Sequence, residues 1–187
     1  AASAALPDPS PGPALVSVDP AQGTSGPGAS TAPNLSPDGF YAGYITSNNL
    51  AQVPGFVAGP HVVVSRFTWD TWIVDPSQSK VVDPADVVVS ARGNFVAFTA
   101  LRNPGDPYSG RSVYTVDLTI GRVQRVDPDP DLVTDTPTIS DDGQTIAYSA
   151  APASDPAATQ IRVWHRSTGA TQVISKVGST PGNGPST

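Results

Sequence analysis

The sequence predicts an all-β protein built from repeated four-stranded antiparallel sheets. The chain has 187 residues, and its 21 Pro and 17 Gly, about a fifth of the total, interrupt helices. A turn-forming tetrapeptide also occurs three times, each time followed by an apolar, strand-like run. Together these observations disfavour a helical fold and indicate short strands joined by tight turns.

The tetrapeptide marks the same place in each unit. Its copies recur at intervals of about fifty residues, and they are Ser36-Pro37-Asp38-Gly39, Ser90-Ala91-Arg92-Gly93 and Ser140-Asp141-Asp142-Gly143. Each ends in Gly, which supplies the positive φ that a tight hairpin turn requires. We therefore expect a hairpin around each copy. Its strands include residues 86–89 and 136–139 before the turns, and residues 40–45, 94–99 and 144–149 after them.

A second hairpin follows the first in every unit. It is expected to pair residues 71–75 with 80–83, 112–117 with 122–127, and 160–164 with 171–175. Each unit then contains four short antiparallel strands, labelled a to d. Residues in the central b and c strands should be buried, and we expect this of Val96, Phe98, Val113, Ile146, Tyr148, Ile161 and Val163.

Four-stranded sheets that repeat with this period are typical of a β-propeller, in which each sheet is one blade. A single blade cannot bury both faces, so blades must stack on one another. A β-sandwich also has short strands and frequent turns, but its strands have no reason to repeat in groups of four. The prediction is therefore three four-stranded blades, which this chain alone does not close because propellers usually have about four to eight.

One extra strand is expected before the first blade, at residues 14–19, which resemble residues 124–128 at the end of the second unit. Its apolar side chains, Leu15, Val16 and Val18, suit it to pair with the edge of another sheet. Both open ends of the row should expose an apolar patch. We expect partners to be other copies of the protein, joined head to tail in preference to a two-fold dimer, or the rest of a longer propeller.

The predicted boundaries divide the chain into six segments. In order, these are a Pro-rich tail at 1–13, the extra strand and a linker at 14–34, blade 1 at 35–84, blade 2 at 85–134, blade 3 at 135–175, and a C-terminal linker at 176–187.

The repeat resembles the TolB-like, WD40-like propeller repeats known as PD40. The likeness is closest to a secreted bacterial type, with a loop like Asn103-Pro104-Gly105-Asp106 and a closing string like Gly182-Asn183-Gly184-Pro185-Ser186. The middle turn departs from the pattern at Ala91-Arg92, and the first unit has Pro54-Gly55-Phe56 where an Asp is expected. The resemblance implies a propeller fold and an exported protein.

Composition limits the location and the partners. The first five residues, Ala-Ala-Ser-Ala-Ala, look like the surroundings of a signal-peptidase site, so we expect a secreted protein or one on the exterior of the cell envelope. The chain has no Cys and therefore no disulfide or thiolate zinc site. A net charge of −6 disfavours nucleic acid as a partner. No apolar run reaches the length of about 18 residues that a membrane helix needs.

Catalytic residues are scarce. The chain contains two His, His61 and His165, no Glu, and no G-x-S-x-G string. We expect His165 on the surface of a strand and His61 in an irregular insertion. The predicted function is a non-catalytic extracellular module for structure or interaction, with a fibre subunit as one form. The alternative is a regulatory or substrate-gating propeller of a larger exported enzyme such as a prolyl-oligopeptidase-type peptidase.

Two clusters suggest binding sites. Calcium prefers oxygen ligands, so Asp127, Asp129 and Asp131, with Asp106 as a further candidate, form a possible calcium site, and no other cofactor is expected. Asp next to Pro is also common in ordinary turns. The aromatic residues Phe67, Trp69, Trp72 and Tyr108 are interpreted as core packing in preference to a binding patch.

Overall fold

A computed structural model of the chain consists of strands and turns in the part that it describes. That part comprises residues 18–19, 24–25, 29–50, 54–66, 70–75, 81–102, 110–177 and 180–181. Within these ranges there is no helix, and hence none long and apolar enough to cross a membrane. The all-β prediction is confirmed.

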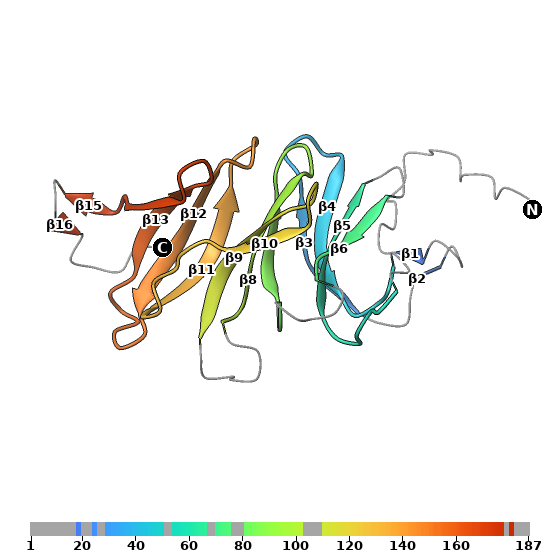
Figure 1. Cartoon of the computed structure of the whole chain (residues 1–187), viewed down its shortest axis with the longest axis horizontal. Helices are drawn as coiled ribbons and strands as arrows, with labels where there is room; N and C mark the ends of the chain where they lie inside the picture. Colours follow the sequence, from blue (N-terminus) through green and yellow to red (C-terminus); the bar gives the residue numbers. More distant parts are fainter. Residues whose placement is uncertain are drawn as a thin grey trace, which may run out of the picture.

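Three four-stranded sheets, the predicted blades, make up most of the structure (Figure 1). Blade 1 contains β3 (Ser30–Leu35), β4 (Tyr41–Thr46), β5 (His61–Arg66) and β6 (Thr71–Ile73). Blade 2 contains β7 (Ala85–Val89), β8 (Phe95–Leu101), β9 (Arg111–Asp117) and β10 (Arg122–Arg125). Blade 3 contains β11 (Leu132–Ile139), β12 (Thr145–Pro152), β13 (Gln160–His165) and β14 (Ala170–Val173).

Within each blade, strands that are consecutive in sequence pair antiparallel. The blades stand side by side in chain order, and the row is open at both ends (Figure 1). The first strand of each following blade makes the junction, since β7 contacts β3 and β4 while β11 contacts β7, β8 and β9. Blade 2 therefore has a neighbour on both faces.

A β-bulge recurs at the same place in the first strand of every blade. The residues concerned are Ala32, Asp86 and Thr136, whose φ angles are 51°, 51° and 45°, and the pairing register shifts around each of them. Each precedes the Ser of its tetrapeptide by the same distance in sequence. A bulge bends a strand and increases its twist, so the repeat found in the sequence extends to the backbone conformation.

The predicted second hairpin is confirmed in blades 2 and 3 but wrong in blade 1. There the third strand is His61–Arg66, and residues 71–73, predicted to belong to the third strand, form the fourth. His61 accordingly begins a central strand and is 1% exposed, where the sequence suggested an irregular insertion. Blade 1 also begins earlier than predicted, at Ser30.

The error arises because the string Val-Asp-Pro, which also ends the second unit at residues 126–128, occurs twice in the first unit, at residues 74–76 and 82–84. Hydrogen bonds identify the first copy as the end of the fourth strand. The main-chain nitrogen of Val74 donates to Val62 at 2.9 Å, as that of Val126 donates to Val113 at 2.9 Å at the end of blade 2.

Most of the predicted core is buried. Five of the seven residues are at most 1% exposed, namely Val96, Phe98, Val113, Ile146 and Tyr148. The prediction is wrong for Ile161 and Val163, which are only partly buried. Trp164, next to Val163 in β13, is the buried side chain at 1% exposure. Side chains alternate between faces along a strand, so only the Trp164 face of β13 meets blade 2.

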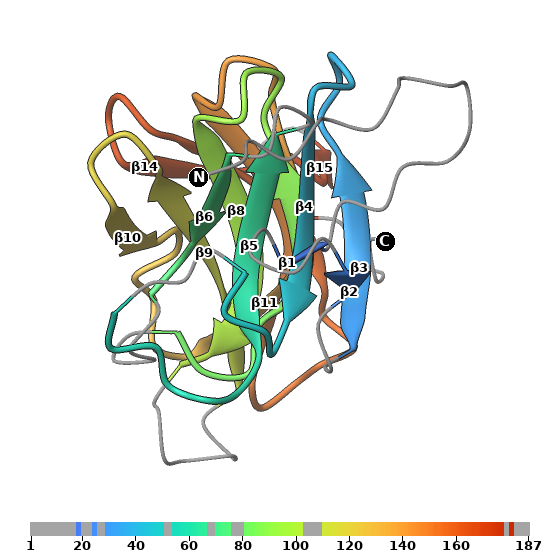
Figure 2. The same ribbon diagram turned by 90° about the vertical axis from the view of Figure 1, so that its right-hand side faces the viewer.

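The two ends of the row differ. On the face of blade 1 away from blade 2, Tyr44 and Val63 are 3% and 0% exposed and pack with Leu50. The prediction of an exposed apolar patch is therefore wrong for these residues. Figure 2 looks onto this face, beside which lies a small hairpin of β1 (Val18–Asp19) and β2 (Thr24–Ser25). At the blade 3 end, Ile174 is 50% exposed.

Val18 of the predicted extra strand pairs with Ser25 of the same chain in this small hairpin. Leu15 and Val16 lie outside the described residues. The predicted C-terminal linker contains a further two-stranded hairpin, β15 (Lys176–Val177) and β16 (Thr180–Pro181). Strand exchange between copies stays a prediction.

Candidate functional site

At each junction between blades, a glycine of one blade packs against an aromatic ring of the preceding blade. A Cβ atom added to Gly93 in the blade 2 turn would lie 2.3 Å from Cδ1 of Tyr41, and one added to Gly143 in the blade 3 turn would lie 2.1 Å from Cδ2 of Phe95. Their φ angles of +66° and +71° are also ones that other residues rarely adopt. The glycine therefore shapes the turn and admits the ring.

Arg166 fixes the junction between blades 2 and 3. Its Nε donates to the Gly143 carbonyl oxygen at 2.9 Å, and its guanidinium also donates to Thr115 Oγ1 at 2.7 Å. The guanidinium carbon lies 4.3 Å from the centre of the Phe95 ring. Burial lowers the pKa of Arg166, while the nearby Asp117 carboxylate acts in the opposite direction. One side chain thus links a turn of blade 3 to two strands of blade 2.

The Ser of each tetrapeptide closes its turn. Ser36 Oγ donates to Asp38 Oδ1 at 2.6 Å and accepts from the main-chain nitrogen of Tyr41 at 2.9 Å. Ser140 makes the same pair of bonds with Asp142 and Thr145, at 2.6 and 3.0 Å. These hydrogen bonds are the first cause of the lowered pKa of Asp38 and of Asp142. Both turns are therefore braced by a carboxylate.

We expect Ser140→Ala to raise the pKa of Asp142 towards its ordinary value, because the strongest donor to the carboxylate is lost. A lowered pKa contributes stability above the pKa of the unfolded chain, and this contribution disappears as the pH falls through the folded value. An NMR titration of Asp142 checks the shift, with Asp38 in the same spectrum as the internal control. An unchanged Asp142 titration would contradict this role of Ser140.

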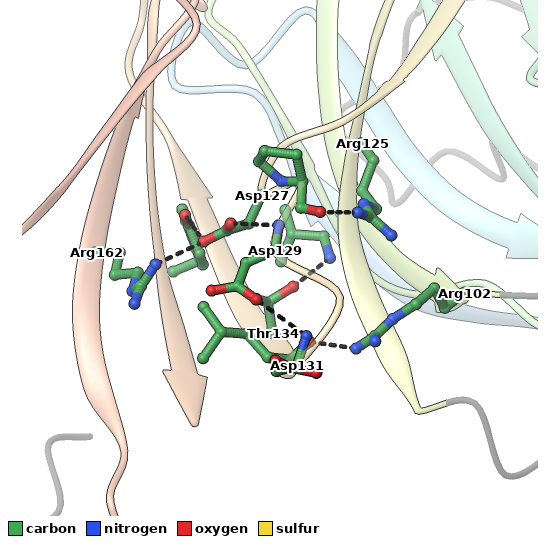
Figure 3. Close-up of polar contacts among 11 residues, drawn as sticks. Arg102, Arg125, Asp127, Asp129, Asp131, Thr134 and Arg162 are labelled. Atoms are coloured by element: carbon green, nitrogen blue, oxygen red, sulfur yellow. Dashed lines mark hydrogen bonds and ion pairs between the residues drawn. The ribbon is translucent and has the colours of Figure 1, made fainter. Parts of the chain in front are cut away.

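The acidic segment lies in the linker between blades 2 and 3 (Figure 3). Asp127 is 4% exposed, and its Oδ2 accepts from Tyr148 Oη at 2.8 Å and pairs with the Arg162 guanidinium at 3.1 Å. Its Oδ1 accepts from the main chain of Asp129, whose own carboxylate accepts from the main chain of Asp131, at 3.1 and 3.0 Å. The carboxylates of Asp127 and Asp129 thus close two successive turns along the linker.

Two arginines of blade 2 hold the other side of this linker (Figure 3). Arg125 donates to the carbonyl oxygen of Pro128, and Arg102 donates to those of Pro130 and Leu132. The linker between the blades is therefore clamped by arginines from both. This explains the row of acidic residues and prolines as a structural connection.

In the described ranges, no three His or Asp side chains are grouped so that they could hold a metal ion. The carboxylates of Asp127 and Asp129 accept hydrogen bonds from protein donors, and those of Asp127, Asp129 and Asp131 do not converge on one point (Figure 3). Asp106 lies outside the described residues. Calcium binding by this loop stays a prediction.

The remaining candidates have ordinary partners or lie on the surface. The His61 ring lies 4.4 Å from that of Phe56, and its Nε2 is 2.7 Å from the Val57 carbonyl oxygen. His165 is exposed on β13, as predicted. Trp72 is 38% exposed, so its interpretation as core is wrong. The other three aromatic candidates, Phe67, Trp69 and Tyr108, lie outside the described residues.

The aromatic-on-glycine contact and Arg166 were not predicted as junction residues. A signal for the contact is present in the sequence, because Tyr41 and Phe95 each stand two positions after the Gly of their own tetrapeptide. The equivalent residue of blade 3 is Thr145. The partner glycine belongs to the next blade, so the pairing becomes visible only in three dimensions.

Solved structures decide the fold. A TolB from Acinetobacter baumannii matches with 20% identity over 80% of this chain and a TM-score of 0.52. This chain folds like part of a TolB-like β-propeller. A putative TolB from Agrobacterium tumefaciens matches at 12% identity over 79% of the chain, with a TM-score of 0.53. The β-propeller domain of the Trilobed protease from Pyrococcus furiosus matches at 12% identity over 79% of the chain, with a TM-score of 0.52.

This chain spans less than half of each of these structures. It covers 32% of the Acinetobacter TolB, 48% of the Agrobacterium protein and 42% of the protease propeller chain. No protein-family model matches it, and no sequence in a curated set of proteins does. The structural matches therefore establish the TolB-like propeller fold of this chain.

Proposed function

We propose that this chain is a set of three consecutive blades in a larger propeller, with a non-catalytic role in binding other protein. The observation that supports this proposal most strongly is the difference in burial between the third strands of blades 2 and 3. The central strand β9 is buried on both faces from Ser112 to Val116, whereas in β13 only Trp164 is buried. The uncovered face of blade 3, with Ile161, Val163 and Ile174, fits a further blade.

The partner that we propose is either another copy of the chain or additional blades of a longer propeller. The part-length matches to TolB and to a protease propeller support the second arrangement. Cell-exterior location belongs to the same proposal and rests on the sequence. Fractionation of the source cells, with detection of the protein outside the cytoplasm, tests it.

If the blade 3 face docks on protein, we expect the isolated chain to self-associate through it at micromolar concentration. Val163→Asp should give a monomer that still unfolds cooperatively, because the new carboxylate stays hydrated in the monomer and would be desolvated in the contact. Ser167→Asp, in the exposed turn after β13, is the matched control and should leave the association intact. Light scattering and thermal unfolding measure the two properties. A wild-type chain that stays monomeric up to 100-fold higher concentration would contradict self-association through this face and leave additional blades of a longer propeller as the partner.

A second candidate function is the gating propeller of a larger exported peptidase. It is favoured by matches to peptidase chains, among them a puromycin-hydrolyzing peptidase from Mycobacterium tuberculosis at 17% identity and a TM-score of 0.50, of which this chain covers 24%. The intact mass of the native gene product distinguishes the two functions, since gating requires a catalytic domain in the same polypeptide.

A further inference from the structure

The junction between blades 1 and 2 is hollowed beside the tetrapeptide turns. Two adjoining hollows of about 370 and 250 Å³ lie there, and Tyr41, Arg66 and Asn94 line both of them. Phe40 and Arg92 border the larger one and Trp72 the smaller. Tyr41 and Gly93, which are in contact across the junction, form part of the wall of the smaller hollow.

The equivalent place between blades 2 and 3 is filled by Arg166. Main-chain hydrogen bonds show which residues correspond, because the nitrogen of Leu118 donates to Asn94 at 2.9 Å just as that of Arg166 donates to Gln144 at 2.8 Å. Leu118 therefore occupies the Arg166 position at the first junction. It has no guanidinium to lie over the ring or to bind the turn carbonyl, and the space remains open.

Charge is reversed at two further positions of this junction. Arg66 pairs with Tyr41 across the sheet, where blade 2 has Asp117 opposite Phe95. Arg92 holds the third position of its tetrapeptide, where the other two copies have Asp38 and Asp142. Two positions at which another blade has Asp thus carry arginine on one small surface.

Both arginines are available to a ligand. Each is exposed, and among the described residues neither forms an ion pair. Arg66 lies 5.9 Å from the centre of the Tyr41 ring. The nearby Asp38 carboxylate accepts from Ser36 and from the main chain of Phe40 at 2.6 and 3.1 Å, so its oxygens are engaged in the turn. Asp70 also borders the smaller hollow.

Apolar rings stand beside the guanidinium groups. Phe40 and Trp72 are 60% and 38% exposed, and the Tyr41 and Trp72 ring centres are 6.5 Å apart. Exposed aromatic residues next to arginine are the combination that is enriched where proteins bind each other. Carboxylates are the usual partners of a guanidinium.

We propose that these hollows bind an acidic peptide segment of a partner protein, one in which Asp or Glu alternates with apolar side chains. The carboxylates pair with Arg66 and Arg92, and the apolar side chains contact Phe40 and Trp72. The site does not depend on how the propeller is completed.

The test uses the full chain and a capped Glu-Phe-Glu-Phe-Glu peptide in isothermal titration calorimetry, with Lys-Phe-Lys-Phe-Lys as the charge-reversed control. We expect only the acidic peptide to bind. Arg66→Ala and Arg92→Ala should each weaken binding about tenfold, as loss of one charge-assisted hydrogen bond does. Arg122→Ala removes another exposed arginine, one outside both hollows, and should leave the affinity unchanged.

Circular dichroism of each variant separates loss of the site from loss of the fold, and Arg66→Lys should retain part of the affinity because it keeps the charge. The proposal is overturned if the acidic peptide does not bind at millimolar concentration, or if the basic peptide binds equally well. It is also overturned if Arg122→Ala weakens binding as much as the other two, or if an anionic alginate oligomer binds while the peptide does not.

Discussion

Replacing Gly143 with alanine should lower the free energy of unfolding by about 2 to 5 kcal/mol. The left-handed backbone at φ +71° costs an L-residue about 1 to 2 kcal/mol, and crowding a well-packed contact adds about 1 to 3. The crowding arises because the new Cβ would lie 2.1 Å from the Phe95 ring. The ring cannot retreat without losing its contact with Arg166.

Gly39 provides a matched control in the same turn of blade 1. Its φ is +75°, but a Cβ there would have nothing within 4 Å. Gly39→Ala should therefore cost only the backbone share of about 1 to 2 kcal/mol. Urea unfolding measures both variants, and Gly143→Ala should cost less in a Phe95→Ala background. Equal losses for Gly39→Ala and Gly143→Ala would show that the ring does not hold the blades together.

The sequence predicts the blades well where each local signal is unambiguous. Ser-x-x-Gly turns locate all three a–b hairpins, because the hydroxyl and the positive φ of Gly are local requirements that adjacent residues satisfy. The assignment fails in blade 1, where Val-Asp-Pro occurs twice and only pairing across the sheet selects the copy at residues 74–76. The bulges at Ala32, Asp86 and Thr136 have no glycine to reveal them.

Burial depends on neighbours that the repeat pattern does not contain. Val113 and Val163 occupy the third strands of blades 2 and 3, which have similar sequences. Val113 is buried, but Val163 is only partly buried because its face of blade 3 has no further blade against it in the described residues. Tyr44, at the other end of the row, is buried although no blade precedes blade 1 in the described residues. The open ends could not be predicted to differ, because the pattern is the same in all three units.

The candidate sites show the same limit. A run of Asp suggested a cation site. In the structure the segment is held by Arg102 and Arg125, which donate to its main-chain carbonyl oxygens, and by Arg162, which pairs with Asp127. These arginines are distant from one another in sequence and belong to two blades. Conversely, the departure of Arg92 from the tetrapeptide pattern is visible in the sequence, but Arg66 is matched to Asp117 only through the pairing of the strands. The structure is also needed to bring the two arginines to one surface.

The buried pair of Asp127 and Arg162 supports the second large prediction, and its two partners should not be equivalent. Asp127 has a side chain that is 4% exposed, against 23% for Arg162. Arg162→Met leaves the carboxylate buried with the hydroxyl of Tyr148 and one main-chain donor, and removal of one partner from a buried pair costs about 3 to 5 kcal/mol. We expect about 3 kcal/mol, because the exposed part of Arg162 admits some water.

Asp127→Asn should be milder, at about 1 to 2 kcal/mol. The amide oxygen still accepts from Tyr148, and Arg162 can turn its charge towards solvent from its partly exposed position. In the double variant no buried charge remains, so its loss should be smaller than the sum of the two single losses. Urea unfolding of the three variants gives the comparison. If Asp127→Asn costs more than Arg162→Met, the connection between blades 2 and 3 depends on the fit of the carboxylate in its turn, and burial of its charge is not what decides the energy.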